Sequence, residues 1–181
     1  MKILEDRSLI RRFKAGDLEA LRRIYEKYKD SLLKLSVVLT NDVNTAQDSV
    51  HEVFLSFAKS IGKIKPRGNL KGYLFASVIN QIRNTKRDSA RHKLTELNDT
   101  DCAVSDMPRP EQWAILSEQL KLLSIAMAQL PDEQREAVAM RIEGDMAFKE
   151  IAAIQEVSAN TVKGRYRYGI DKLRSILDGK V

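Results

Sequence analysis

The stretch FKEIAAIQEVSANTVKGRYRY, residues 148–168, predicts two short helices joined by a tight turn. Apolar residues recur along one side of the first helix, and Ser158 can cap the N-terminus of the second. Val162 points back at the first helix, where the small side chain of Ala152 lets the two backbones cross closely. We therefore expect a helix-turn-helix, in which Glu156 occupies a turn position where glycine would adopt a positive φ more easily.

The second predicted helix leaves one face free, and polar side chains line this face. Hydroxyl and amide groups suit base edges, whereas long cationic side chains suit phosphates. The candidate DNA-contacting residues here are Ser158, Asn160, Thr161, Lys163, Arg165 and Arg167. An ordinary helical hairpin with a solvated basic face fits the same pattern, so this stretch alone leaves both interpretations open.

The composition indicates an all-α protein. Of the 181 residues, 43% are hydrophobic, glycine and proline are few, and runs of β-branched residues are missing. The net charge of +6 permits a nucleic-acid partner without requiring one. The single cysteine, Cys102, excludes an intramolecular disulfide. No apolar signal segment or stretch of transmembrane length occurs, so we expect a cytoplasmic protein.

The first part of the chain predicts a helical bundle. Asp17 can cap a long helix whose apolar residues recur at three- and four-residue steps, which indicates a buried stripe. Thr45 can start the next helix, with Phe54 on its inward side. The outer face of that helix carries polar side chains that suit a protein partner: Asp48, His51 and Glu52.

A basic segment follows. Residues 62–69, GKIKPRGN, predict a loop, and Asn69 can cap the helix after it. Cations greatly outnumber acids between residues 62 and 96. The acids are Asp88 and Glu96, and the cations are Lys63, Lys65, Arg67, Lys71, Arg83, Lys86, Arg87, Arg91 and Lys93. A solvated helix normally mixes its charges, so this block favours contact with phosphates.

Residues 97–110 are acidic, contain proline and lack a helical apolar period, which predicts an interdomain linker rather than a metal site. Helix is expected to resume at Glu111, with apolar candidates for burial that include Leu120, Leu123, Ile125 and Met127. A further helix runs from Pro131 to Gly144, with Val138 and Ile142 packed on the helix-turn-helix. We therefore expect two small helical domains, residues 1–96 and 111–181, which fold independently and are joined by a flexible linker.

The sequence lacks the motifs of the common enzyme classes. No glycine-rich phosphate loop, nucleophile elbow or metal-helix motif occurs, and His51 and His92 lie far apart on expected helix surfaces. We expect no catalysis, no cofactor and no bound metal.

Three segments together resemble the extracytoplasmic-function (group four) sigma factors of bacterial RNA polymerase. AQDSVHEVFLSF is similar to region 2.2 of that family, GNLKGYLFASVINQIRNTKR to regions 2.3 and 2.4, and residues 130–177 to region 4. The resemblance covers nearly the whole chain. It implies an initiation factor without catalysis of its own, whose partners are core polymerase and promoter DNA, and it suggests an anti-sigma protein as a further partner.

The resemblance also implies roles for individual residues. It places Asp48, Glu52 and Phe54 on the surface that docks on the clamp helices of the largest polymerase subunit, with His51 where the family usually has Gln. The loop at residues 62–69 resembles the segment that holds a flipped base of the minus-ten element, with Asn80 beneath it. Phosphate contacts there fall to Arg83, Lys86 and Arg87. Tyr73 stands where the family usually has Trp, and Asn84 stands where it commonly has Asp. The resemblance therefore leaves open which bases these two residues read. In region 4, Ser158, Asn160, Thr161, Lys163 and Arg165 match the family's readers of the minus-thirty-five element.

A free-standing transcriptional regulator and a helical interaction protein are the two alternative classes of function. A free-standing transcriptional regulator would bind duplex DNA through the same helix-turn-helix, but it would not need the basic block at residues 62–87. A helical interaction protein would instead bind an acidic partner. Measuring the salt dependence of binding with and without DNA would distinguish it from a DNA-binding protein.

Overall fold

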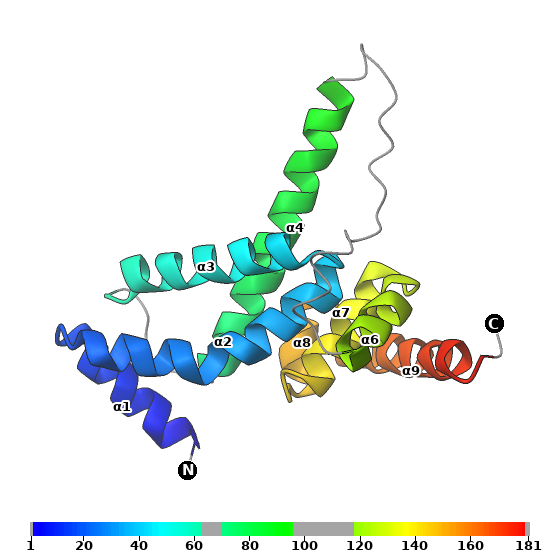
Figure 1. Cartoon of the computed structure of the whole chain (residues 1–181). Coiled ribbons are helices and arrows are strands. Elements are labelled where there is room, and N and C mark those ends of the chain that lie inside the picture. Colours follow the sequence, from blue (N-terminus) through cyan, green and yellow to red (C-terminus); the bar gives the residue numbers. More distant parts are fainter. Residues whose placement is uncertain (1, 63–69, 96–117, 180–181) are drawn as a thin grey trace.

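The computed structural model describes residues 2–62, 70–95 and 118–179, and helices make up most of these ranges (Figure 1). The N-terminal unit consists of four helices. They are α1 (Lys2–Lys14), α2 (Leu18–Thr40), α3 (Val43–Ser60) and α4 (Leu70–Thr95). The all-α class predicted from the sequence is confirmed.

In the part of the chain that the structure describes, the C-terminal unit has four helices. They are α6 (Glu118–Ala128), α7 (Asp132–Ile142), α8 (Phe148–Gln155) and α9 (Ala159–Leu177). The expected linker and the residues between Glu111 and Ser117 lie outside the described residues. No helix in the described ranges has the length and apolar character needed to cross a membrane.

Side-chain caps fix where several helices begin. The carboxylate of Asp17 accepts hydrogen bonds from the amides of Glu19 and Ala20, as the sequence predicts. Asp42, rather than Thr45, caps α3 by accepting from the Thr45 amide at 2.6 Å, so this helix begins two residues earlier than expected. Because such a cap satisfies an amide that has no partner within the helix, each contributes about 1 kcal/mol.

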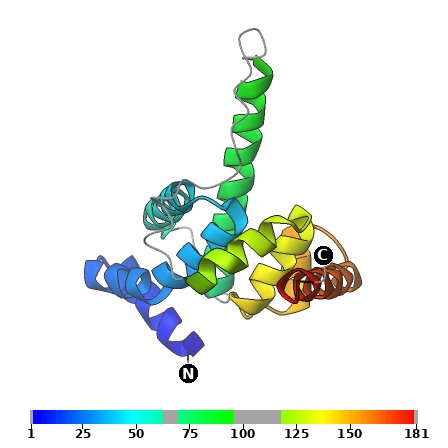
Figure 2. The same cartoon turned by 45° about the vertical axis from the view of Figure 1, so that its right-hand side comes forward.

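The core of the N-terminal unit lies between α2, α3 and α4. Ile24 and Leu32 of α2, Phe57 of α3, and Leu74 and Phe75 of α4 are all at most 1% exposed. Burial of each such side chain stabilises the fold by about 1.5–3 kcal/mol relative to exposure. The long α4 extends from this core well beyond the rest of the molecule (Figures 1 and 2).

The C-terminal unit is organised around the contact between α7 and α9. Val138, Ile151 and Val162 are at most 2% exposed, as the sequence predicts for the core beneath the helix-turn-helix. The prediction for Ile142 is wrong, because it is the last residue of α7 and is 61% exposed. Leu123 and Ile125 of α6 were also expected to be buried and are instead 40% and 46% exposed.

The two units share one continuous core. Leu35 and Val38 of α2 belong to the same apolar cluster as Met127 of α6 and Ala139 of α7. The hydroxyl of Ser124, buried in α6, donates to the Asn41 side chain at the end of α2 over 2.9 Å. In this conformation the two units therefore pack against each other, and their independent folding stays a prediction.

Candidate nucleic-acid interface

The helix-turn-helix has a locally strained turn. Glu156 ends α8 in the left-handed conformation, at φ 54° and ψ 40°, which confirms the position predicted from the sequence. A side chain in this conformation costs roughly 1 kcal/mol or more relative to glycine. The next helix then begins with Ser158, whose hydroxyl oxygen accepts from the Thr161 amide at 3.0 Å.

The first two turns of α9 present the predicted base-reading and phosphate-binding side chains to solvent. Ser158, Asn160, Thr161, Lys163 and Arg167 are exposed. The hydroxyls of Ser158 and Thr161 lie 2.8 Å apart, and the Arg167 guanidinium lies 5.1 Å from the centre of the Tyr168 ring. This end of the helix can therefore enter a groove of DNA without first exposing buried groups.

Arg165 differs from the other predicted contacts of α9. It is partly buried, and its Nη1 donates to Oε1 of Gln155 on α8 over 2.9 Å. The bond holds the guanidinium against the turn of the helix-turn-helix.

The predicted minus-ten residues divide between two faces of α4. Tyr73, Asn80, Asn84 and Arg87 recur at three-, four- and seven-residue steps, so they form one stripe along the helix. All four are exposed, and Arg87 donates through Nη2 to Oδ1 of Asn84 over 2.9 Å. The stripe combines an aromatic ring for base stacking, amides for base edges and a cation for the backbone.

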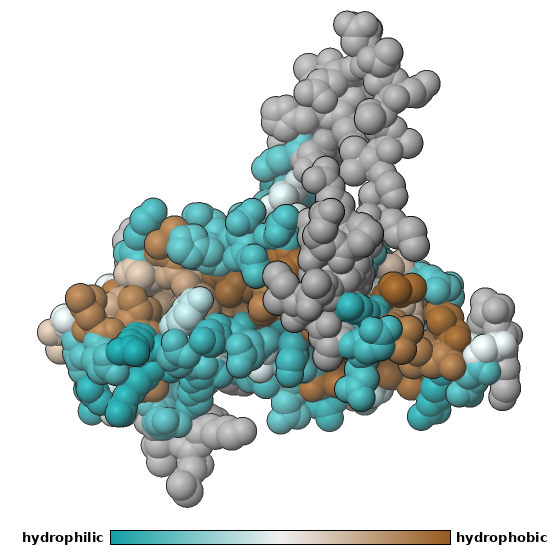
Figure 3. All heavy atoms as spheres, in the orientation of Figure 1, coloured by the Kyte–Doolittle hydropathy of each residue, from teal (hydrophilic) through white to brown (hydrophobic). Residues whose placement is uncertain are grey.

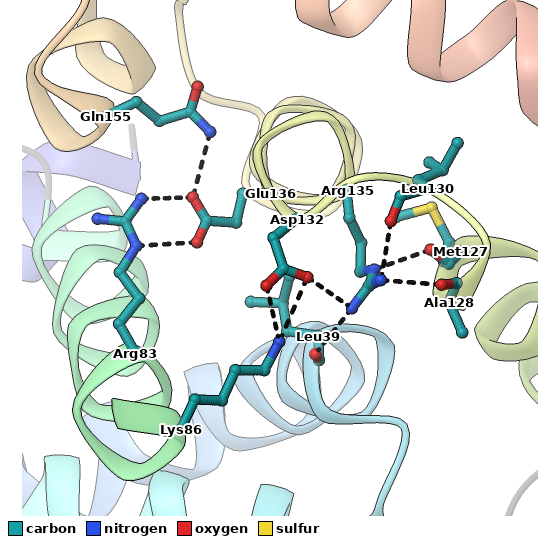
Figure 4. A network of polar contacts seen from close by, with 10 residues as sticks. All are labelled: Leu39, Arg83, Lys86, Met127, Ala128, Leu130, Asp132, Arg135, Glu136 and Gln155. Atoms are coloured by element: carbon teal, nitrogen blue, oxygen red, sulfur yellow. Dashed lines mark hydrogen bonds and ion pairs between the residues drawn. The ribbon is translucent and has the colours of Figure 1, made fainter. Parts of the chain in front are cut away.

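Arg83 lies on a neighbouring face of α4 that is directed at the C-terminal unit (Figure 4). Its guanidinium makes a two-pronged ion pair with Glu136 of α7, in which Nε donates to Oε1 over 2.9 Å and Nη2 donates to Oε2. Its Nη1 also donates to the carbonyl of Ile154 over 3.3 Å. The hydrogen bonds to Glu136 raise the pKa of Arg83 above its ordinary value, so the guanidinium stays charged.

Lys86, one turn further along α4, faces the same helix of the C-terminal unit. Its Nζ lies 3.2 and 3.3 Å from the two carboxylate oxygens of Asp132 (Figure 4). Asp132 also forms an ion pair with Arg135, whose guanidinium donates to carbonyls at the end of α6 and to the Leu39 carbonyl at the end of α2. Both cations on this face are therefore paired with acids of the C-terminal unit.

A further residue extends these contacts to the recognition helix. Gln155 donates through Nε2 to Oε2 of Glu136 over 3.1 Å and to the Glu133 carbonyl over 2.9 Å, while its Oε1 accepts from Arg165. Sequence reasoning missed Glu136, Asp132 and Gln155, because no local pattern marks pairings between different helices such as Arg83 with Glu136 or Lys86 with Asp132.

The candidate polymerase surface lies on α3, beside α2. Asp48, His51 and Glu52 are exposed, and the first two line an open hollow between α2 and α3. Phe54 requires a correction as a contact residue. It is only 7% exposed, and its ring packs edge-on against Tyr25 with 4.8 Å between centroids. It therefore supports the surface from below.

Lys63, Lys65 and Arg67 lie outside the described residues, so their predicted contact with DNA stays a prediction.

Comparison with known proteins assigns the chain to a family. The family model "Sigma-70 region 2" matches residues 24–92, which include most of α2, all of α3 and most of α4, and "Sigma-70, region 4" matches residues 126–175. The chain is 25% identical to the RNA polymerase sigma-H factor of Pseudomonas aeruginosa, with 93% of both chains covered. It is 26% identical to the ECF RNA polymerase sigma factor SigW of Bacillus subtilis, with 93% of this chain and 94% of that one covered.

A solved structure has the same fold. The sigma factor RpoE, in complex with the anti-sigma factor NepR from Bartonella quintana, superposes with a TM-score of 0.68 at 20% identity, over 87% of this chain and 98% of that one. Two sigma-70 regions in the family's order, carried on the helices described above, lead to one assignment. The chain belongs to the extracytoplasmic-function family of RNA polymerase sigma factors.

Proposed function

We propose that the chain directs bacterial RNA polymerase to specific promoters and helps to open them, without catalysis of its own. The observation that carries the proposal is the presence of two different DNA-facing surfaces on one chain. The α4 stripe has the side chains suited to unstacked bases, and the N-terminal turns of α9 have those suited to a duplex groove. A regulator that binds only duplex DNA needs the second surface alone.

The proposed division of labour follows the two units. Residues 1–96 dock on core polymerase and recognise the minus-ten element, residues 97–110 link the units, and residues 111–181 recognise the minus-thirty-five element. The exposed hollow that Asp48 and His51 line, with Glu52 beside it, is the proposed contact with the polymerase clamp helices. Because polymerase and the chromosome are cytoplasmic in bacteria, we propose that the chain acts there.

A second protein partner also fits the surface. Apolar residues gather around α6 and α9 at the right of the space-filling view (Figure 3). They adjoin a groove of about 280 Å³ that both units line, with Val38 from α2, Leu123 from α6 and Ile142 from α7 among its residues. Since the structural relative RpoE is bound to an anti-sigma factor, we propose an anti-sigma protein as the partner that covers apolar surface here.

Binding of the minus-ten element tests the proposed function. The full chain with core polymerase should bind a single-stranded minus-ten oligonucleotide more tightly than the same duplex, measured by fluorescence anisotropy. On a single strand the protein avoids the few kcal/mol of unpairing and unstacking, so the affinity should rise by roughly one to a few powers of ten. A nonspecific basic patch would instead prefer the higher charge density of the duplex.

Variants on α4 separate reading of bases from contact with phosphates. Asn80→Ala should remove the sequence preference on single strands and keep most of the salt-dependent affinity, whereas Arg87→Ala should lower affinity for all sequences. Arg22→Ala, which removes an exposed cation of α2, is the matched control and should change neither. Preference for the duplex, together with an Asn80→Ala variant that behaves like the parent, would support the free-standing regulator.

The same logic applies to α9 and the minus-thirty-five duplex. Asn160→Ala should change which sequences are preferred, and Lys163→Ala should weaken binding to all of them and reduce the salt slope by about one. Lys172→Ala, in the C-terminal half of the same helix, is the control for charge. If Lys163→Ala altered preference without altering affinity, the assigned roles would be wrong.

A further inference from the structure

A row of cations runs along one face of α1, outside the surfaces described above. Arg7, Arg11 and Lys14 follow one another at steps of four and three residues, so they share one face of the helix, and all three are exposed. We call these three residues the α1 row. Within the part of the chain that the structure describes, neither Arg7 nor Arg11 forms an ion pair with an acid, so both charges are open to a partner.

The acids of α1 are turned away from this row and are bound by α2. Nζ of Lys27 donates to Oε2 of Glu5 over 2.7 Å and to Oδ1 of Asp6 over 2.8 Å. Asp6 is only 5% exposed, and its Oδ2 also accepts from the Tyr28 hydroxyl at 2.6 Å. A solvated helix normally mixes its charges, whereas the α1 row is wholly basic. The same bonds fix α1 on α2, so the row is held in one place.

Aromatic rings connect the end of α1 to the start of the proposed minus-ten surface. The ring of Phe13 stacks on that of Phe57 with 6.2 Å between centroids, and the Phe57 ring lies 6.1 Å from that of Tyr73. In both ribbon views α1 lies below α2, on the side where α4 begins (Figures 1 and 2). Tyr73 is 41% exposed and is the first residue of the α4 stripe. The α1 row therefore adjoins the Tyr73 end of that stripe.

The DNA that can reach this row is a single strand. Because α9 has the side chains suited to a duplex groove, the DNA between the two promoter elements stays duplex, and a single strand can continue only downstream of the minus-ten element. Cations that follow the backbone, beside an aromatic ring on which a base stacks, are typical of single-strand binding. The α1 row is about 10 Å long at 1.5 Å per residue, which matches about three nucleotides at about 3.4 Å each.

We propose that the α1 row binds phosphates of the single strand immediately downstream of the minus-ten element. The inference rests on the proposed function and adds a third DNA contact to the two surfaces described above. Phosphate contacts carry no sequence information, so the row adds affinity for any downstream sequence and positions the strand as it leaves Tyr73.

Oligonucleotides of different extent test this path. The full chain with core polymerase is titrated by fluorescence anisotropy with three single strands: the minus-ten element alone, the element with six more nucleotides on its 3′ side, and the element with six more on its 5′ side. The test variant combines Arg7→Gln with Arg11→Gln. It should bind the 3′-extended strand about tenfold more weakly than the parent at low salt, and its plot of log affinity against log salt should be shallower by about 1.4, or about 0.7 for each of two phosphates. On the other two strands it should match the parent within about twofold.

Two further variants separate charge at this place from charge in general. Lys172→Gln with Arg174→Gln removes the same charge from exposed positions in the C-terminal half of α9 and should match the parent on all three strands. Arg7→Lys with Arg11→Lys keeps the charge and should keep most of the affinity for the 3′-extended strand, because lysine also binds phosphate. Far-ultraviolet circular dichroism checks that each variant keeps its helices.

The other outcomes overturn the proposal. Equal affinity of the parent and the glutamine variant for the 3′-extended strand would show that the α1 row does not touch DNA. An equal loss on all three strands would mean that the row acts only through the net charge, and a loss confined to the 5′ extension would place the strand in the opposite direction. Weaker binding of the variant to core polymerase without DNA would make the row a contact with polymerase.

The short oligonucleotide separates this proposal from the proposed function. If the parent with polymerase binds none of the three strands, the proposed function fails, and the α1 row fails with it. If the parent binds the minus-ten element alone and the glutamine variant matches it on every strand, only the contact through the α1 row is refuted.

Discussion

Two glycines of α9 provide a direct test of how closely α7 and α9 pack. A Cβ added at Gly169 would lie 2.8 Å from Cγ2 of Val138, whereas a Cβ at Gly164 meets no atom within 4 Å. Carbon atoms prefer separations of about 3.5–4.0 Å, so Gly169→Ala must push the helices apart. Overpacking of this kind costs about 1–3 kcal/mol. Both substitutions also gain about 1 kcal/mol of helix propensity, which cancels when the two variants are compared.

The expected result is a difference in stability between the two variants. Gly164→Ala should be about 1 kcal/mol more stable than the parent, and Gly169→Ala should be less stable than Gly164→Ala by roughly 2 kcal/mol. For a chain of this size that difference corresponds to about 4–8 °C in the midpoint of thermal unfolding, followed by circular dichroism. Equal midpoints for the two variants would refute the close contact between α7 and α9.

Two further predictions concern the helix termini. At the strained turn, Glu156→Gly should be about 1 kcal/mol more stable than Glu156→Ala in urea unfolding, because both variants lose the carboxylate and only glycine relieves the positive φ; equal stability would contradict the strain. At the start of α2, the hydrogen bond from Arg12 lowers the pKa of Asp17 below its ordinary value, so this pair stabilises the fold above the unfolded-state pKa and the contribution is lost as the pH falls through the folded-state pKa. The parent should therefore be slightly more stable than Arg12→Gln near neutral pH and should lose this advantage in acid, and a difference that persists in acid would rule the pair out as its cause.

Features set by residues close in the sequence could be predicted. The cap at Asp17, the cap at Ser158 and the left-handed turn at Glu156 each depend on backbone atoms within a few positions, so the sequence is enough to locate them. The family resemblance added the identity of the two regions, which the helix-turn-helix pattern alone leaves open.

Features set by packing between distant segments could not be predicted. Periodicity does not decide which side of a short helix is covered by a neighbour, so it could not predict the exposure of Ile142 at the end of α7 or of Leu123 in the middle of α6. The pairing of Arg83 with Glu136 spans both units and leaves no mark in either local sequence. In the structure Arg83 is therefore an ion-paired side chain, whereas the sequence alone suggested a cation available to phosphate.

In vitro transcription with core polymerase on a promoter library tests the central claim most directly. The account predicts that transcripts from a defined set of promoters appear only when the chain is added, and that Asn160→Ala changes which promoters are used. It also predicts that Asp48→Ala, on the proposed docking surface, weakens transcription from all of them. Absence of any promoter-specific transcript with core polymerase, while the chain alone binds duplex DNA at particular sequences, would contradict the account.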